Sequence, residues 1–241
     1  HEPANEYHAR SRSGEFMSSH LLADFRESPA LYRKEISGEI EGKESAAFIM
    51  GRAAHSFILE GRSAFDREYV VSDGPVNPRT GESYGRNTKA FAEWAAKQER
   101  EVVSGKDFNF LLKLQRSVWL HPAAEELLAA GEAEGVVRAE YCGIPCQIRM
   151  DWFSPESGLV DLKTCDSLKW FESDATGCTV SVHIIAVEKN EPFSSGVWKL
   201  TDEVLNLAEQ INQSALRNYR ECLNTSFWPT GYEEKRIIDT L

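Results

Sequence analysis

The segment that decides the fold is residues 136–164, VVRAEYCGIPCQIRMDWFSPESGLVDLKT. Polar and apolar residues alternate over 136–142 and again over 146–153, and Gly-Ile-Pro separates the two runs. A second turn signal, SPESG at 154–158, precedes the mostly apolar run LVDLKT. Alternation with a period of two is typical of strands, and Gly, Pro and Ser are typical of the turns between them. The segment therefore predicts a meander of three antiparallel strands.

One face of this meander carries charged side chains that would lie side by side. Side chains at positions i and i+2 share a face of a strand, so Asp161 lies beside Lys163 and Arg149 lies beside Asp151. A solvent-facing sheet with cross-strand charge pairs gives the same pattern, and the pattern alone favours that interpretation. The alternative is a convergence of three carboxylates, those of Glu140, Asp151 and Asp161, around Lys163.

Clustered carboxylates with a lysine would suit metal-dependent phosphate chemistry. Hard divalent cations such as Mg²⁺ bind carboxylate oxygens together with water and substrate phosphate. A lysine beside such a site can orient or deprotonate the attacking water, and it can neutralise charge on the phosphate in the transition state. The second interpretation therefore predicts a site for phosphodiester hydrolysis.

The rest of the chain predicts helices before the meander, and two strands and a long helix after it. Apolar residues recur at helical spacing over 18–60, with a break at Pro29, and again over 107–131. Beta-branched residues fill 179–189, and an amphipathic helix begins at Thr201. We expect an α/β (α+β) fold in which helices flank a central mixed sheet.

The expected organisation is a loose N-terminal arm followed by one domain. Residues 1–17 are polar and form the arm. Residues 18–241 form the domain, with a helical part over 18–131 and a sheet-containing core over 132–241. A length of 241 residues, with 41% hydrophobic and 27% charged residues, fits such a globular protein.

Charge and hydropathy restrict the functional class. The net charge of −11 argues against nonspecific coating of nucleic acid, although an acidic protein can still hold a local basic groove. No apolar run approaches the length of about 18 residues that a transmembrane helix needs. Residues 1–16 lack the apolar core of a signal peptide. We therefore expect a cytoplasmic protein without a membrane partner.

The cysteines do not form a framework. Their odd number and scattered spacing argue against disulfide bonds; they are Cys142, Cys146, Cys165, Cys178 and Cys222. A zinc site needs about four ligands, and the first two cysteines lack a second close pair. We expect free thiols and no zinc.

The residues of the meander resemble the signature of a known superfamily. Asp151 followed by Asp161-Leu162-Lys163 is similar to the PD-(D/E)XK nuclease signature, with Met150 in place of the proline. Most of residues 18–232 resemble the RecE-type (exodeoxyribonuclease VIII-like) branch, which is related to phage lambda exonuclease. The segments that carry this resemblance are SSHLLADFRESPALY at 18–32, GRAAHSFILEG at 51–61, RAEY at 138–141 and HIIAVEKNEPF at 183–193.

The resemblance implies a restriction-endonuclease-like core with a Mg²⁺ site, in which Mn²⁺ would substitute. Asp151 and Asp161 would be the principal metal ligands, together with the backbone carbonyl of Leu162. Lys163 would be the catalytic lysine. The number of metal ions, one or two, stays open.

Two further residues receive roles from the resemblance. His55 would bind or lie near the metal, although a lone histidine on an apolar helix is more often packed in a core. Glu140 would be an additional catalytic acid. For both residues the alternative is an ordinary structural position.

Three residues are candidates for contacts with DNA phosphate. Arg149 would hold a phosphate or pair with Glu140 or Asp151. Ser18 and Ser19 would bind a phosphate at the N-terminus of the following helix, or serve as an ordinary N-cap.

Besides Met150, one departure from the family pattern concerns the region after the meander. The family places a helix with a Gln-x-x-x-Tyr pattern there, whereas DSLKWFESDA at 166–175 leads directly into TGCTVSVHII. Either that helix has been lost or the sequence omits a stretch between Ala175 and Thr176, and the short join favours omission. Some relatives hold an iron–sulfur cluster through one early and three late cysteines. Because all five cysteines follow residue 141, we expect no iron–sulfur cluster.

The resemblance implies an exonuclease that degrades duplex DNA from its ends, 5′ to 3′, in phage-type recombination. It also implies a ring-shaped homo-oligomer and a single-strand annealing partner. Two alternatives stay open: a catalytically inactive DNA-binding or assembly module of the same fold, and a restriction-type endonuclease.

Overall fold

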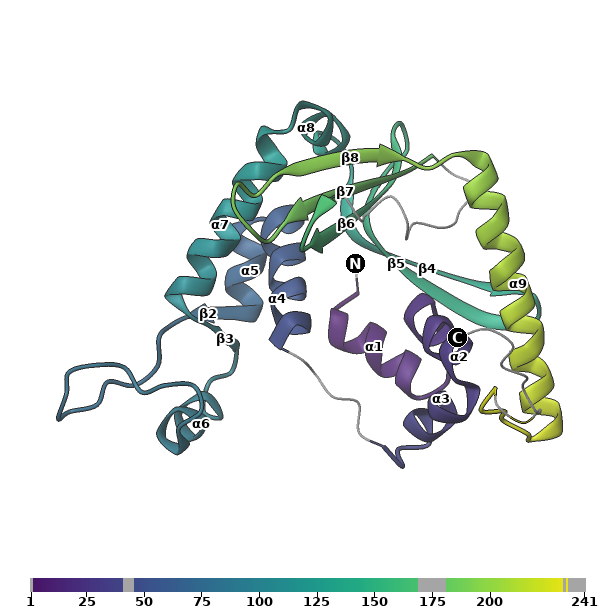
Figure 1. The fold of residues 1–241 in the computed structure, drawn as a ribbon, viewed down its shortest axis with the longest axis horizontal. Coiled ribbons are helices and arrows are strands. Elements are labelled where there is room, and N and C mark those ends of the chain that lie inside the picture. The colour runs from purple at the N-terminus through teal and green to yellow at the C-terminus, as the bar shows by residue number, and fades with distance from the viewer. Residues whose placement is uncertain (1, 41–45, 169–180, 232, 234–241) are drawn as a thin grey trace, which may run out of the picture.

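The protein is described by a computed structural model that covers residues 2–40, 46–168, 181–231 and 233. A six-stranded sheet forms its centre, with the strand order β1–β5–β6–β7–β8 and with β4 also paired to β5 (Figure 1). The strands are β1 (Met17–Ser18), β4 (Glu132–Tyr141), β5 (Ile144–Ser154), β6 (Gly158–Cys165), β7 (Val182–Glu188) and β8 (Ser195–Lys199). Strands β4, β5 and β6 form the expected antiparallel meander, and β6 and β7 run parallel. The expected mixed α/β fold with helices around a central sheet is confirmed.

The two turns of the meander depend on glycines. Cys142 and Gly143 both have positive φ angles, 53° and 75°, at the turn between β4 and β5. Gly158 opens β6 with a φ of 91°, and a Cβ atom there would lie 2.1 Å from the carbonyl oxygen of Ser181. Only glycine fits this close backbone approach, which places β6 directly against β7.

A first group of helices packs on one face of β6 and β7. These helices are α4 (Ala46–His55), the π-helical turn η1 (Ser56–Glu60), α5 (Arg62–Glu68), α7 (Gly105–Leu120) and α8 (Pro122–Leu128). The N–H of Gly61 donates to the carbonyl oxygen of Ser56 at 3.0 Å and closes η1. Leu162 and Ile185 from the strands are fully buried against Phe57, Leu111 and other side chains of these helices. This is the larger of the two apolar clusters in the described residues.

A second group of helices lies at the other end of the sheet (Figure 1). It consists of α2 (Ser19–Glu27), α3 (Pro29–Ile36) and the long α9 (Asp202–Thr225). The break expected at Pro29 separates α2 from α3, and the side chain of Thr201 accepts the Val204 N–H at the start of α9. The core of this group is aromatic, because Phe25, Tyr32 and Trp228 pack together there.

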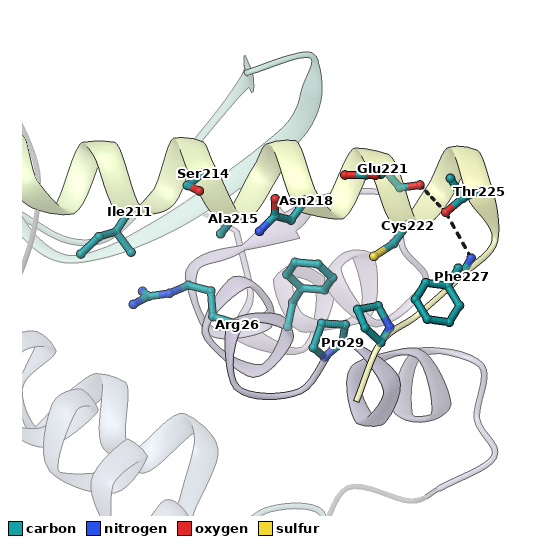
Figure 2. Close-up of a pocket in the computed structure, with 12 residues that line it drawn as sticks. Arg26, Pro29, Ile211, Ser214, Ala215, Asn218, Glu221, Cys222, Thr225 and Phe227 are labelled. Carbon is teal, nitrogen blue, oxygen red and sulfur yellow. Dashed lines mark hydrogen bonds between the residues drawn. The ribbon is translucent and has the colours of Figure 1, made fainter. Parts of the chain in front are cut away.

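A groove with a volume of about 680 Å³ lies between α9 and the α2–α3 pair. In Figure 2, Arg26 and Pro29 face Ile211, Asn218 and Cys222 across it. Its lining contains none of the residues that the sequence placed in the candidate site. The groove is therefore separate from that site.

The N-terminal residues differ from expectation. Residues 4–12 form a helix, α1 (Ala4–Arg12), although the sequence placed 1–17 in a loose arm. Tyr7 and Ser11 on α1 are buried, and the side-chain amide of Gln147 on β5 donates to the Tyr7 carbonyl at 2.9 Å and the Ser11 hydroxyl at 2.6 Å. Polar contacts, rather than an apolar stripe, hold this helix, and this explains why the apolar pattern does not reveal it.

The remaining elements extend from the first helical group. Strands β2 (Tyr69–Val71) and β3 (Glu101–Val103) form a parallel pair, and α6 (Lys89–Ala95) lies between them in the chain. The part expected to be helical, 18–131, thus also contributes short strands. No helix in the described ranges is both long enough and apolar enough to cross a membrane. The join between Ala175 and Thr176 lies outside the described residues.

Candidate metal centre

The candidate site lies beside residues 148–151 of β5, which have no strand partner on one edge. On that edge β5 pairs with β1 through Cys146 and Gln147, and with β6 from Trp152 to Ser154. Residues 148–151 lie between these two ladders, while β4 pairs along the opposite edge. In this gap the edge of β5 is not occupied by a neighbouring strand, so side chains from other elements can approach it.

Asp151 and Asp161 flank the point at which β5 and β6 separate. The pairs Phe153–Leu159 and Trp152–Val160 precede this point, and continuing the same register places Asp151 opposite Asp161. In place of a ladder bond, the N–H of Leu162 donates to Oδ2 of Asp151 at 2.8 Å. The N–H and C=O of one residue point to the same side of a strand, so the Leu162 carbonyl also faces this gap. Its side chain is fully buried on the other face.

His55 reaches the same gap from the end of α4. Its Nδ1 atom lies 3.4 Å from Oδ2 of Asp151. Burial acts to lower the pKa of His55, but the charge and hydrogen bond of Asp151 outweigh burial and raise it. The structure therefore brings His55 to the carboxylates and not into the apolar core.

Glu134, and not Glu140, is the acid that β4 contributes. The pairs Ala133–Trp152 and Gly135–Met150 enclose Glu134, so that it lies opposite Asp151. Glu134 is buried and has a φ of 60°, an unusual angle for a residue with a side chain. Glu140 pairs with Pro145 at the far end of the hairpin, where it is exposed, about 20 Å along the strand from Glu134. The expectation that Glu140 joins Asp151 is corrected accordingly.

The sequence contained a signal that could have found Glu134. The turn joins Tyr141 to Ile144, and counting back along both strands from this pair leads to Glu134 and Asp151. The alternation that predicted the first strand begins only at Val136. Gly135 separates Glu134 from this run, so the alternating pattern does not extend to Glu134. Register, rather than alternation, would have identified the residue.

Lys163 and Asp161 form an ion pair at the open side of the site. The Nζ atom of Lys163 lies 2.7 Å from Oδ1 of Asp161, and the two side chains are 50% and 41% exposed. Burial acts to lower the pKa of Lys163, but Asp161 and Asp151 raise it above its ordinary value. The lysine therefore remains protonated in the absence of a ligand.

Arg149 makes an ion pair with Glu134, which was not among the partners expected from the sequence. Its Nε atom contacts Oε2 of Glu134, and the two side chains are 15% and 9% exposed. The sequence left a phosphate contact or a pair with Glu140 or Asp151 as alternatives. The structure shows a pair, with Glu134 as the partner.

Ser18 acts as an N-cap. Its hydroxyl accepts the N–H of Leu21 at 3.3 Å, and the residue is buried. Ser19 is exposed on the first turn of α2. Ser18 therefore forms the N-cap that the sequence offered as one alternative, and a phosphate contact of Ser18 or Ser19 stays a prediction.

Burial and mutual repulsion act on the acids of the site. Burial raises the pKa of Glu134, and Asp151 adds to this effect although Arg149 opposes it. Burial also raises the pKa of Asp161, against the opposing charge of Lys163. For Asp151, burial is outweighed by His55, Lys163 and the Leu162 N–H, so its pKa lies below the ordinary value. Three acids packed this closely gain from a further positive charge among them.

The donor atoms present fit a divalent cation. Ligand atoms of His55, Glu134 and Asp151 all lie within 4.8 Å of one another, and this is the one such group in the described ranges. Carboxylate oxygens with a backbone carbonyl are the ligands that Mg²⁺ and Mn²⁺ prefer. The site is thus a possible acidic and histidine metal centre, in which Asp161 and the Leu162 carbonyl lie next to the three clustered side chains.

Comparisons with known proteins agree with this description. The model of a family described as a PDDEXK-like domain of unknown function (DUF3799) matches residues 18–173, which include every residue of the site. A crystal structure of a protein from Eubacterium rectale, to which an exonuclease activity is provisionally assigned, superimposes with a TM-score of 0.67. The similarity covers 100% of this chain and 96% of that chain at 16% identity, and at this identity it shows the fold alone. No curated protein sequence matches significantly.

Proposed function

This chain belongs to the family of PDDEXK-like domains, and from this premise we propose that it is a divalent-metal-dependent nuclease acting on DNA. The expected resemblance to the PD-(D/E)XK superfamily is confirmed by the family match. The observation that carries the proposal is the convergence of His55, Glu134 and Asp151 beside the Asp161–Lys163 pair. A solvent-facing sheet would not gather buried acids of like charge in this way.

The fit of the donor set supports a role for Mg²⁺, with Mn²⁺ as a substitute. When bound, such a cation lowers the pKa of a water molecule and stabilises the negative charge that develops on the phosphate. Glu134, Asp151 and His55, with the Leu162 carbonyl, would hold it in the gap along β5. The hydrolysis joins a water oxygen to phosphorus and breaks one phosphodiester P–O bond, and the two products share the water's protons.

Lys163 would act as a positive charge. Its raised pKa favours the ammonium form, which donates hydrogen bonds but cannot accept a proton. Asp161 holds this ammonium group at the open side of the site, where a phosphate would arrive. We therefore infer that Lys163 neutralises charge on the phosphate and orients the attacking water from its position at the open side of the site.

The finer features of the proposed activity rest on the resemblance to RecE-type exonucleases. They are attack at duplex ends, 5′ to 3′ polarity, a role in phage-type recombination, a ring-shaped homo-oligomer and a single-strand annealing partner. Two features favour the alternative of an inactive module: the short join after Ala175, which lies outside the described residues, and the net charge of −11. The presence of Glu134, Asp151 and Asp161 together with Lys163 favours an active enzyme over an inactive module.

The test is digestion of linear and covalently closed circular duplex DNA with Mg²⁺, with Mn²⁺ and with excess EDTA. We expect linear DNA to be degraded with either cation, EDTA to stop the reaction, and Lys163→Ala to slow it by about 10²–10⁴-fold. Lys113→Ala is the matched control, because Lys113 makes a comparable ion pair with Glu191 at 2.9 Å on α7. Cleavage of the circle would indicate a restriction-type endonuclease. Normal digestion by Lys163→Ala, or in EDTA, would show the assignment to be wrong.

A further inference from the structure

The contact between Arg149 and Glu134 is unusual for a pair of charged residues. The two side chains lie diagonally across β4 and β5, and both are largely withdrawn from solvent. Burying two charges costs several kcal/mol per ion, and their mutual attraction offsets this only in good geometry. A pair in this position is therefore weak as a device for stability alone.

Glu134 lies in the least favourable position that an acid could have on β4. Its side chain shares a face with Asp151, which lies opposite it, and the ligand atoms of the two are within 4.8 Å. Like charges directly opposite each other destabilise a sheet. Its backbone is also in the left-handed region, with a φ of 60°, which is unfavourable for a residue with a side chain and recurs at functional sites.

Arg149 supplies the opposing charge from the adjacent position on the same face. Its Nε atom contacts only one oxygen of Glu134, Oε2, and this leaves Oε1 available for another partner. The Nη1 atom of Arg149 is buried without a hydrogen-bond partner in the described residues. A buried donor without a partner is unfavourable, so the hydrogen bonds of the guanidinium group do not by themselves explain its position.

We propose that Arg149 is a positioning residue that holds Glu134 in place, with one carboxylate oxygen turned to the metal centre. The inference rests on the proposed function, because it assigns Arg149 a role toward the cation of that site. It develops the ion-pair alternative rather than the phosphate contact, because an Arg149 side chain that is 15% exposed and engaged with Glu134 is poorly placed to meet DNA. The planar fork of arginine matters here, because lysine offers a point charge and cannot fix the carboxylate's orientation in the same way.

The test measures Mn²⁺ binding to the full chain by isothermal titration calorimetry, without DNA. We expect Arg149→Met to weaken Mn²⁺ binding by about 10–100-fold, the usual effect of removing a partner of a metal ligand. The matched control is Arg138→Met. Arg138 lies on the same face of the hairpin and contacts a glutamate, Glu2, but it lies toward the turn. Its replacement should leave the Mn²⁺ affinity within about twofold of the wild type.

A double-mutant cycle separates positioning from general structural damage. If Arg149 acts through Glu134, then Glu134→Gln combined with Arg149→Met should bind Mn²⁺ no more weakly than Glu134→Gln alone. Full additivity of the two losses would overturn the inference. An Mn²⁺ affinity of Arg149→Met equal to that of the wild type would also overturn it.

Two further measurements keep the result interpretable. If Arg149→Met does not fold, Arg149→Lys keeps the charge without the fork and should still lose several-fold in affinity. An unchanged affinity in Arg149→Lys would then overturn the proposal. Failure of the wild-type protein to bind Mn²⁺ would instead contradict the proposed function, and the two failures are distinguishable in the same titrations.

Discussion

The two ends of the β4–β5 hairpin use the same residue types in opposite ways. Near the turn, Arg138 contacts Gln147 and Glu2, and Gln147 in turn contacts α1, so that the polar groups satisfy one another. Near the fork between β5 and β6, Glu134 and Asp151 lie together and a nitrogen of Arg149 has no partner in the described residues. At the turn end of the hairpin, near Arg138 and Gln147, each polar group has a partner. At the fork end, near Glu134 and Asp151, carboxylates of like charge lie close together. Such local conflicts are expected at functional sites.

The largest effect should follow from Asp151→Asn at the fork end. The change keeps the shape of the side chain but removes the charge that contacts His55 and accepts the Leu162 N–H. We expect DNA cleavage to fall by about 10³-fold or more and Mn²⁺ binding to be lost. Initial rates on linear DNA and thermal unfolding with and without Mn²⁺ would check this. Wild-type cleavage in this variant would remove Asp151 from the site.

A smaller effect, on stability and not on function, should follow from Gln147→Leu at the turn end. Leucine fits the volume but leaves the buried Ser11 hydroxyl and Tyr7 carbonyl without the amide. We expect the free energy of unfolding to fall by about 1–3 kcal/mol. Urea unfolding measures this change, and the Mn²⁺ affinity of the folded protein should match the wild type. A loss of metal binding without a loss of stability would contradict the division between the two ends.

The smallest effect should follow from Glu140→Gln. Glu140 is exposed beside the turn, where the removal of one charge changes stability by no more than about 0.5 kcal/mol. We expect cleavage and Mn²⁺ affinity to equal the wild type, in contrast to Glu134→Gln. Comparing these two variants by calorimetry and by digestion of linear DNA tests which acid of β4 belongs to the site. A greater loss in Glu140→Gln would reverse the assignment.

The same contrast explains how much the sequence could predict. The meander, its turns and the closeness of Asp151 to Asp161 follow from alternation and from the turn signals at the two corners. His55 could be brought to the carboxylates only through the resemblance, because nothing in a helical pattern indicates which strand the helix end will meet. Glu134 could not be predicted from alternation, because it lies before the alternating run and is separated from it by Gly135.

Helix α1 shows a different limit. It presents a polar sequence, and its partner Gln147 is a single buried amide on a strand, 140 residues from Tyr7 in the chain. Hydropathy cannot reveal an attachment that depends on hydrogen bonds to backbone and hydroxyl groups. A polar segment adjacent to a predicted strand can therefore be structural, even where its composition indicates a free arm.

The π-helical turn η1 begins directly after His55. In an α-helix each residue advances about 100° around the axis, and a turn closed from Gly61 back to Ser56 holds one residue more than an α-helical turn. Removing one residue from η1 would restore α-helical winding but rotate His55 by about a quarter of a circle relative to α5, which follows the turn and carries the buried Phe65. The angular phase of α4, and with it the direction of the imidazole, is thus set by the length of the turn that follows and not by the residues beside it.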